Sequence, residues 1–180
     1  MNLAAFQEAL NARGVEVATF FAALPTQDFT RAAPERWSAA QHLDHLIRSH
    51  EVLALALSMP RDRFGWEQRT PPGSRSAAEL QSAYLEALRG GVKASGRFRF
   101  LPDPQGTQAE LVQTHRDSVA LLEHHLTAYC TDSELHGATL PHPALGEVSL
   151  AETLHFTLYH DLHHLRGVQT ALNPQALEIP

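Results

Sequence analysis

Histidines at helical spacing are the residues in this chain that point most directly to chemistry. The chain has 12 histidines among 180 residues, and His160 and His164 lie four positions apart in a run with helical apolar spacing. Residues at i and i+4 share one face of a helix. Two imidazoles placed in this way can hold one metal ion, and a third from a facing helix would complete a three-histidine site with an open position. The alternative interpretation is that both rings only form hydrogen bonds at the edge of the core.

Three histidines of an earlier helical run compete for the third position. Apolar residues from Leu43 to Leu57 define the main face of that run, which includes His50 and leaves His42 and His45 at its sides. Periodicity therefore favours His50 as the buried histidine, and it does not decide which of the three would be a ligand.

The other histidines are interpreted as structural or exposed. His163 points about 100° away from its neighbour His164 on a helix, and His142 lies in a Pro- and Gly-containing turn before the last helical run. Four more have no histidine partner four residues away on their own face: His115, His124, His125 and His136.

Other catalytic patterns are missing from the sequence. It contains no G-x-S-x-G nucleophile turn, no phosphate-binding P-loop and no dinucleotide glycine motif. Asp161 follows His160, so the zinc-protease motif H-E-x-x-H is absent, and the paired Glu-x-x-His motifs of di-iron bundles are absent too. Cys130, the single cysteine, is expected to be a small buried apolar residue at a helix end.

Four capping boxes show where helical runs begin, and three of these runs carry histidines. In this motif a Ser or Thr side chain accepts the N3 amide, and a Glu or Gln at N3 accepts the amide of the cap residue. The four pairs are Ser38/Gln41, Ser76/Glu79, Thr107/Glu110 and Ser149/Glu152. Each pair precedes a run with helical apolar spacing.

The sequence predicts an all-α fold, a four-helix bundle with an additional short helix or long loop in a single domain over residues 1–180. The expected helices cover residues 3–24, 39–59, 77–90, 108–130 and 150–172. Residues 97–101 are expected to form an extended connection. Residues 60–75 form a long loop with Trp66, which either borders a site or packs on the surface.

Composition excludes several classes of protein. The formal charge is −6 and Lys/Arg residues form no block, which argues against a nucleic-acid surface. One cysteine permits no disulfide within the chain. No apolar run approaches the roughly 18 residues of a membrane span, and the N-terminus does not resemble a signal peptide. A cytoplasmic protein that binds no nucleic acid and no membrane is expected.

Two segments resemble the DinB/YfiT-like superfamily of metalloenzymes. The first is W-S-A-A-Q-H-L-D-H-L, residues 37–46, and the second runs over residues 142–169 and ends in H-x-x-x-H-x-x-x-x-Q. The resemblance implies a four-helix bundle with a three-histidine metal site, usually in a homodimer. Carried over residue by residue, it implies His45, His160 and His164 as the metal ligands.

The resemblance also implies which residues support the site. Gln41 stands where Glu is common in the family, and Gln41, Asp161 and the Trp66 loop are candidates to orient a ligand or the substrate. Zinc or nickel is expected in the isolated protein, with iron or manganese as alternatives, because imidazole accepts several of these ions.

Relatives in this superfamily include transferases and an isomerase that depend on low-molecular-weight thiols. The function implied is therefore a metal-dependent thiol S-transferase, in which a small thiol attacks a small-molecule electrophile as part of a stress response. Two alternatives stay open at the level of the sequence. One is a metal-dependent hydrolase, and the other is a non-catalytic metal-binding stress protein. The catalytic residues themselves are not assigned.

Overall fold

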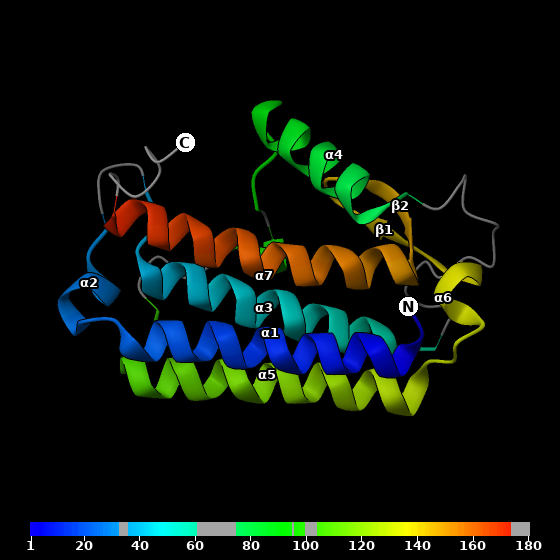
Figure 1. Ribbon diagram of the computed structural model, residues 1–180, viewed down its shortest axis with the longest axis horizontal. Coiled ribbons are helices and arrows are strands. Elements are labelled where there is room, and N and C mark those ends of the chain that lie inside the picture. Colours follow the sequence, from blue (N-terminus) through cyan, green and yellow to red (C-terminus); the bar gives the residue numbers. More distant parts are fainter. Residues whose placement is uncertain (33–35, 61–74, 95, 100–103, 174–180) are drawn as a thin grey trace.

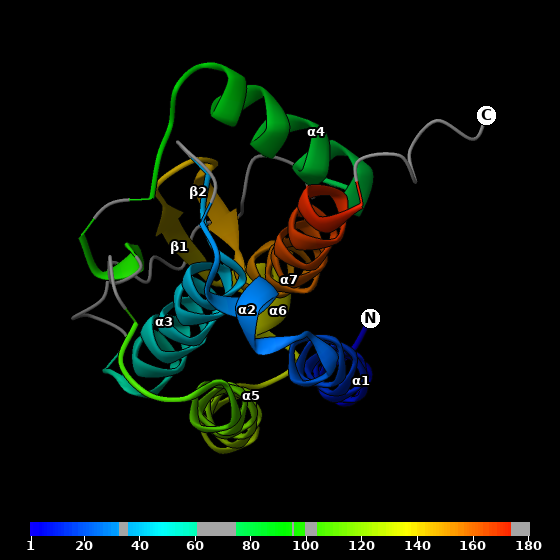
Figure 2. The same cartoon turned by 90° about the vertical axis from the view of Figure 1, so that its left-hand side faces the viewer.

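Four long helices run side by side in the computed structural model, which describes residues 1–32, 36–60, 75–94, 96–99 and 104–173 (Figure 1). They are α1 (Leu3–Ala23), α3 (Ala39–Ser58), α5 (Gln108–Tyr129) and α7 (Leu150–Leu172). Helix α5 packs against α1 and α3, and α7 packs against the same two helices from the other side. Seen end-on, the four helices occupy the corners of a bundle (Figure 2). The predicted all-α four-helix bundle is confirmed.

The capping boxes begin the helices where the sequence predicts. All four pairs make both hydrogen bonds of the motif, at the starts of α3, α4 (Ala77–Arg89), α5 and α7. A Ser or Thr cap contributes about 1 kcal/mol relative to Ala. Because the caps fix where α3 and α7 start, they also fix the phase at which the histidines of these helices face each other.

The bundle core consists of two apolar clusters with a polar layer between them. One cluster includes Phe6, Leu122 and Leu154, and the other includes Phe21 and Leu43. Between these positions, the three helices α3, α5 and α7 contribute buried polar side chains, which are His50, His115, Ser118 and Asp161. Each apolar cluster stabilises the bundle by about 25 cal/mol for each Å² of apolar surface removed from water.

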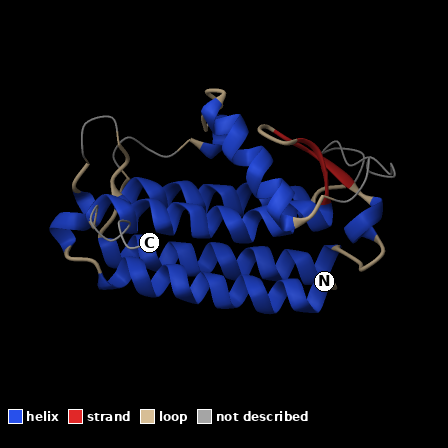
Figure 3. Ribbon diagram, turned by 45° about the horizontal axis from the view of Figure 1, so that its top comes forward, coloured by secondary structure: helices blue, strands red, loops and turns tan. Residues whose placement is uncertain are grey.

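A helix and a hairpin lie outside the bundle, on the side of α3 and α7 (Figure 3). Helix α4 packs on α7. Strands β1 (Thr139–His142) and β2 (Gly146–Ser149) pair antiparallel, and the positive φ of 73° at Gly146 closes their turn. The hairpin leads directly into α7, where the Leu150 amide donates to the Ala138 carbonyl.

Several short elements were not predicted. They are α2 (Thr26–Thr30), α6 (Glu134–Gly137) and the β1–β2 hairpin. Each has five residues or fewer, so none is long enough to show a period in the sequence. The extended connection predicted for residues 97–101 is wrong at its start, since Gly96–Phe98 forms a 3₁₀ turn, η1. Residues 61–74, with the predicted Trp66 loop, lie outside the described residues.

Candidate metal centre

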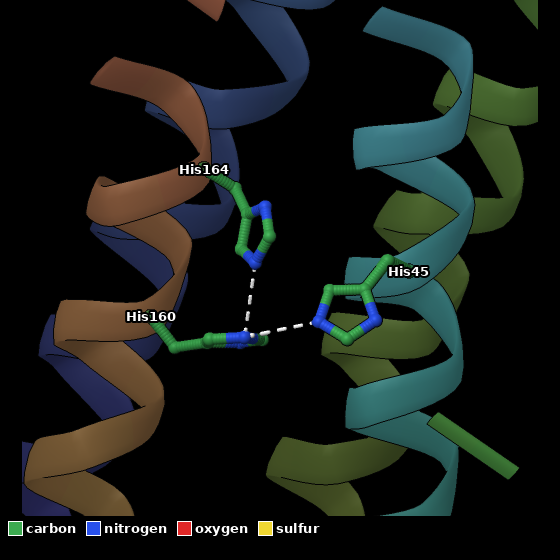
Figure 4. Close-up of side chains that lie close together, drawn as sticks. All are labelled: His45, His160 and His164. Carbon is green, nitrogen blue, oxygen red and sulfur yellow. Dashed lines mark hydrogen bonds between the residues drawn. The ribbon is translucent and has the colours of Figure 1, made fainter. Parts of the chain in front are cut away.

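The structure brings His45, His160 and His164 together between α3 and α7. Their Nε2 atoms converge, with 3.1 Å between His45 and His160 and 3.1 Å between His160 and His164 (Figure 4). The three nitrogens that could serve as ligands all lie within 4.8 Å of one another. Each side chain is only 4–6% exposed.

These separations fit a shared cation. For tetrahedral angles and Zn–N bonds of about 2.0–2.1 Å, two ligand nitrogens lie ~3.3 Å apart. One shared hydrogen cannot provide a partner for all three rings, because a hydrogen bond joins only two of the three Nε2 atoms at a time. A cation on the common side of the rings would accept all three lone pairs. The donor set therefore fits a metal ion, and its assignment as a ligand set stays a prediction.

Burial keeps these imidazoles neutral. It lowers the pKa of His160 and of His164 well below the ordinary histidine value, and the neighbouring imidazoles lower them further. Burial also lowers the pKa of His45, against the opposing effect of its hydrogen bond to the Phe98 carbonyl. Neutral rings are the form that binds metals, because a protonated nitrogen has no lone pair to donate.

The hydrogen bonds on the far side of the rings determine which nitrogen faces the centre. The Nδ1 of His45 lies against the carbonyl oxygen of Phe98, which can only accept, so this Nδ1 carries the hydrogen. The lone pair of neutral His45 is then on Nε2, which points at the other two rings. The Nδ1 of His164 lies 2.7 Å from the Nδ1 of His42. If His164 donates this bond, its Nε2 also presents a lone pair.

Aromatic rings fix the orientation of the imidazoles. Trp37 stacks on His164 with an interplanar angle of 13° and a centroid distance of 5.6 Å. Phe156, one turn earlier on α7, stacks on His160 at 5.2 Å. The ring of Tyr84 meets His160 edge-on at 6.1 Å, which brings α4 to the site. Burial raises the pKa of the Tyr84 phenol to about 12, so it stays protonated.

The three histidines line a pocket of about 760 Å³ between α3, α4, α7, the hairpin and η1. This volume is within the range of small-molecule sites. The wall also contains His42, His142 and His163. His142 accepts hydrogen bonds at Nδ1 from the amides of Ala144 and Leu145, so its lone pair there is used within the hairpin turn. A ligand entering this pocket would meet the histidine trio directly.

His50, which periodicity favoured as the buried histidine, is buried but belongs to a different set of contacts. Its Nε2 lies 3.0 Å from Asp161 and its Nδ1 lies 3.2 Å from the Ser118 hydroxyl. Both His50 and His45 are buried, because α3 faces the bundle core on one side and the pocket on the other. Burial therefore could not distinguish the two histidines.

The residues expected to orient a ligand have other contacts in the structure. Gln41 completes the capping box of α3, where its side chain accepts the Ser38 amide. Asp161 binds His50. The contacts that reach the trio's outer nitrogens come instead from His42 and from the Phe98 carbonyl. Of these two contacts only His42 has a signal in the sequence, since it precedes His45 by three positions on the same helix.

The other histidines interpreted above as structural or exposed have the positions expected of them, with one exception. His124 and His136 are exposed, His115 is fully buried, and His125 bonds the Ala54 carbonyl through Nδ1. The exception is His163, which is half-buried and lines the pocket, with its ring 5.3 Å from that of His164. Cys130 is buried in an apolar cluster, as predicted.

Comparison with models of known protein families shows the family of this chain. The family model of the DinB superfamily matches residues 9–167, which include α3, α5, most of α1 and α7, and the histidine trio. The protein therefore belongs to the DinB superfamily. No curated protein and no solved structure matches the chain. None of the helices in the described part of the chain has the length and apolarity needed to cross a membrane.

Proposed function

We propose that this protein is a metal-dependent enzyme that joins a low-molecular-weight thiol to a small electrophile. One observation supports the proposal most strongly. Three buried Nε2 atoms converge on the wall of a pocket large enough for a thiol and a second small molecule. His45, His160 and His164 would be the ligands of the metal, with zinc or nickel expected in the isolated protein.

A divalent ion with open positions is a Lewis acid that lowers the pKa of a coordinated thiol or water. The sulfur lone pair then forms a bond to the electrophilic carbon. The bond from that carbon to its leaving group breaks, and the leaving group takes the bonding pair. The thiol proton passes to solvent. Atoms and electrons balance without an oxidant or a reductant.

The protein's own residues supply orientation and an apolar setting for this step. The Phe98 carbonyl and His42 hold two of the rings with Nε2 toward the pocket. Phe156 and Tyr84 cover His160 and limit the approach of water. The Tyr84 phenol, protonated at neutral pH, lines the pocket and is suited to donate a hydrogen bond to a leaving group.

Metal analysis of purified variants tests the ligand set. Wild type and His124→Ala, a matched change at an exposed histidine, should retain about one ion per chain. His45→Ala, His160→Ala and His164→Ala should each lose it. Retention of the ion by any of these three variants at wild-type affinity would show that the ligand set is wrong.

The cobalt-substituted protein tests the reaction. Addition of glutathione, bacillithiol or mycothiol should change its visible absorption spectrum, and one of these thiols should be conjugated to 1-chloro-2,4-dinitrobenzene faster than without protein. A protein that binds the ion, shows no spectral response to thiols and cleaves ester substrates would instead be a hydrolase. A protein that binds the ion and does neither would be a non-catalytic metal-binding protein.

A further inference from the structure

The charge of the pocket wall is opposite to that of the chain. The chain has 20 acidic and 14 basic residues. Among the described residues that line the pocket there is no Asp or Glu, while Lys93 and Arg99 both line it. Lys93 is also the single lysine of the sequence. A positive pocket in a chain of formal charge −6 would attract anions against the general repulsion of the surface.

Neither cation is neutralised within the described part of the protein. Four other arginines do form pairs, which are Arg13–Glu16, Arg31–Asp28, Arg48–Asp44 and Arg75–Glu152. Lys93 and Arg99 are exposed and form no ion pair with any described carboxylate. Their charges are therefore available to a ligand.

Arg99 directly follows a residue that contacts the histidine trio. The carbonyl of the preceding residue, Phe98, binds the Nδ1 of His45, and η1 packs against α3. An anionic group held by Arg99 would thus be bound close to the trio, on the η1 side of the pocket.

Most of the remaining wall is apolar. Three helices and the hairpin contribute the side chains Val52, Leu53, Leu88, Leu140, Val148 and Phe156. A fully hydrophilic anion has no apolar surface to bury against these residues, whereas an apolar body gains about 25 cal/mol for each Å² removed from water.

We propose that this pocket binds small organic anions with an apolar body, such as aryl or branched alkyl carboxylates and sulfonates. The apolar part packs against the hairpin, α4 and Phe156, and the anionic group lies beside Lys93 and Arg99. That such a compound is the electrophilic substrate rests on the function proposed above. Its binding does not, because the wall and both cations belong to the protein itself.

Two fluorescent dyes with almost the same skeleton test this proposal. 8-Anilino-1-naphthalenesulfonate carries one negative charge, and N-phenyl-1-naphthylamine carries none. Each is titrated into EDTA-treated protein near neutral pH. The wild type should prefer the sulfonate dye. Lys93→Gln and Arg99→Gln should each weaken it by about two- to five-fold, as expected for partly exposed charge pairs, and leave the affinity for the neutral dye unchanged within about two-fold.

Two further variants locate the dyes. Arg116→Gln removes an exposed charge beside a second cavity, of about 740 Å³, between α2, α3 and α5, and it should change nothing. Val52→Trp fills the proposed pocket and should weaken both dyes. Displacement of the sulfonate dye by 4-phenylbutyrate, and not by glutathione, would show that the pocket binds anions of the electrophile's kind and not the thiol. Displacement by glutathione alone would contradict the requirement for an apolar body.

Equal affinity of the wild type for both dyes would overturn the proposal, and so would an equal effect of Arg116→Gln and Arg99→Gln. Metal analysis of the same wild-type protein separates this proposal from the function above, because the dyes are titrated after the metal has been removed. A chain that binds no metal and still prefers the sulfonate dye would refute the proposed function alone. A chain that binds metal without this preference would refute the anion pocket alone.

Discussion

The hydrogen bond between His42 and His164 gives a direct test of how the metal candidate is organised. The two Nδ1 atoms are 2.7 Å apart. For His164 to direct a lone pair at the trio, its Nδ1 must donate to His42. His42→Phe removes the acceptor and keeps a ring of similar size beside Trp37, whose centroid lies 5.2 Å from that of His42.

The effect of this change should fall on the metal-bound state. Without a metal, His164 can move its hydrogen to Nε2 and donate to His160 over 3.1 Å, so no donor is left unsatisfied. With a metal, Nε2 must carry a lone pair, and the buried Nδ1–H then has no acceptor, which costs about 1–3 kcal/mol. Loss of such outer partners typically lowers metal affinity about 10- to 100-fold.

Zinc affinity, measured near neutral pH by competition with a chromophoric chelator, gives the readout. His42→Phe should bind zinc about 10- to 100-fold more weakly, and His42→Gln, whose side-chain oxygen can accept, should recover part of the loss. His124→Phe, an exposed matched control, should match the wild type. The reasoning fails if His42→Phe binds zinc as tightly as wild type. It also fails if His42→Phe lowers the unfolding free energy of the metal-free protein by as much as it weakens metal binding. The change would then act on the fold and not on the metal-bound state.

Two predictions concern the buried polar layer and are measured by urea unfolding of metal-free protein. His50→Leu should destabilise by about 3–5 kcal/mol, because it leaves the Asp161 carboxylate buried without its partner. The double variant His50→Leu/Asp161→Leu should lose less unfolding free energy than the two single variants together. Additive losses would mean that the two side chains are not coupled. Burial lowers the pKa of His115 from 6.5 to about 4, so its neutral form stabilises the fold fully above pH 6.5, and this contribution is lost as the pH falls toward 4. His115→Leu should therefore flatten the decline in unfolding free energy between pH 7.5 and 4.5 by about 2–3 kcal/mol, and an unchanged slope would contradict this.

The long helices were predictable because their signals are local. Each bundle helix has more than five turns of apolar spacing, and three of them start at a capping box that both sequence and structure show. The predicted boundaries agree with the observed ones within one residue, for example 150–172 for α7. The hairpin was missed because its two strands have four residues each, and their apolar positions face α7 only once the bundle has formed.

The site was less predictable because a helix between two buried surfaces has no single buried face. His45 and His50 of α3 are 4% and 1% exposed, yet one faces the pocket and the other faces Ser118 and Asp161. The resemblance to a family, and not periodicity, singled out His45. The Phe98 carbonyl could not have been predicted from any side-chain pattern, because it is a backbone group brought to His45 by a 3₁₀ turn distant in sequence.

The distribution of charge around the trio connects the two proposals. Metal-binding histidines often donate to a carboxylate, which makes them more basic and offsets part of the metal's charge. Here the described partners of the outer nitrogens are neutral, namely a carbonyl for His45 and an imidazole for His164. Asp161, although adjacent to His160 in sequence, is hydrogen-bonded to His50 in the polar layer. A divalent ion held by these rings would keep nearly its full charge, beside a pocket whose own formal charges are both positive. Such a site selects for ligands that bring negative charge with them, which is what a thiolate and an organic anion have in common.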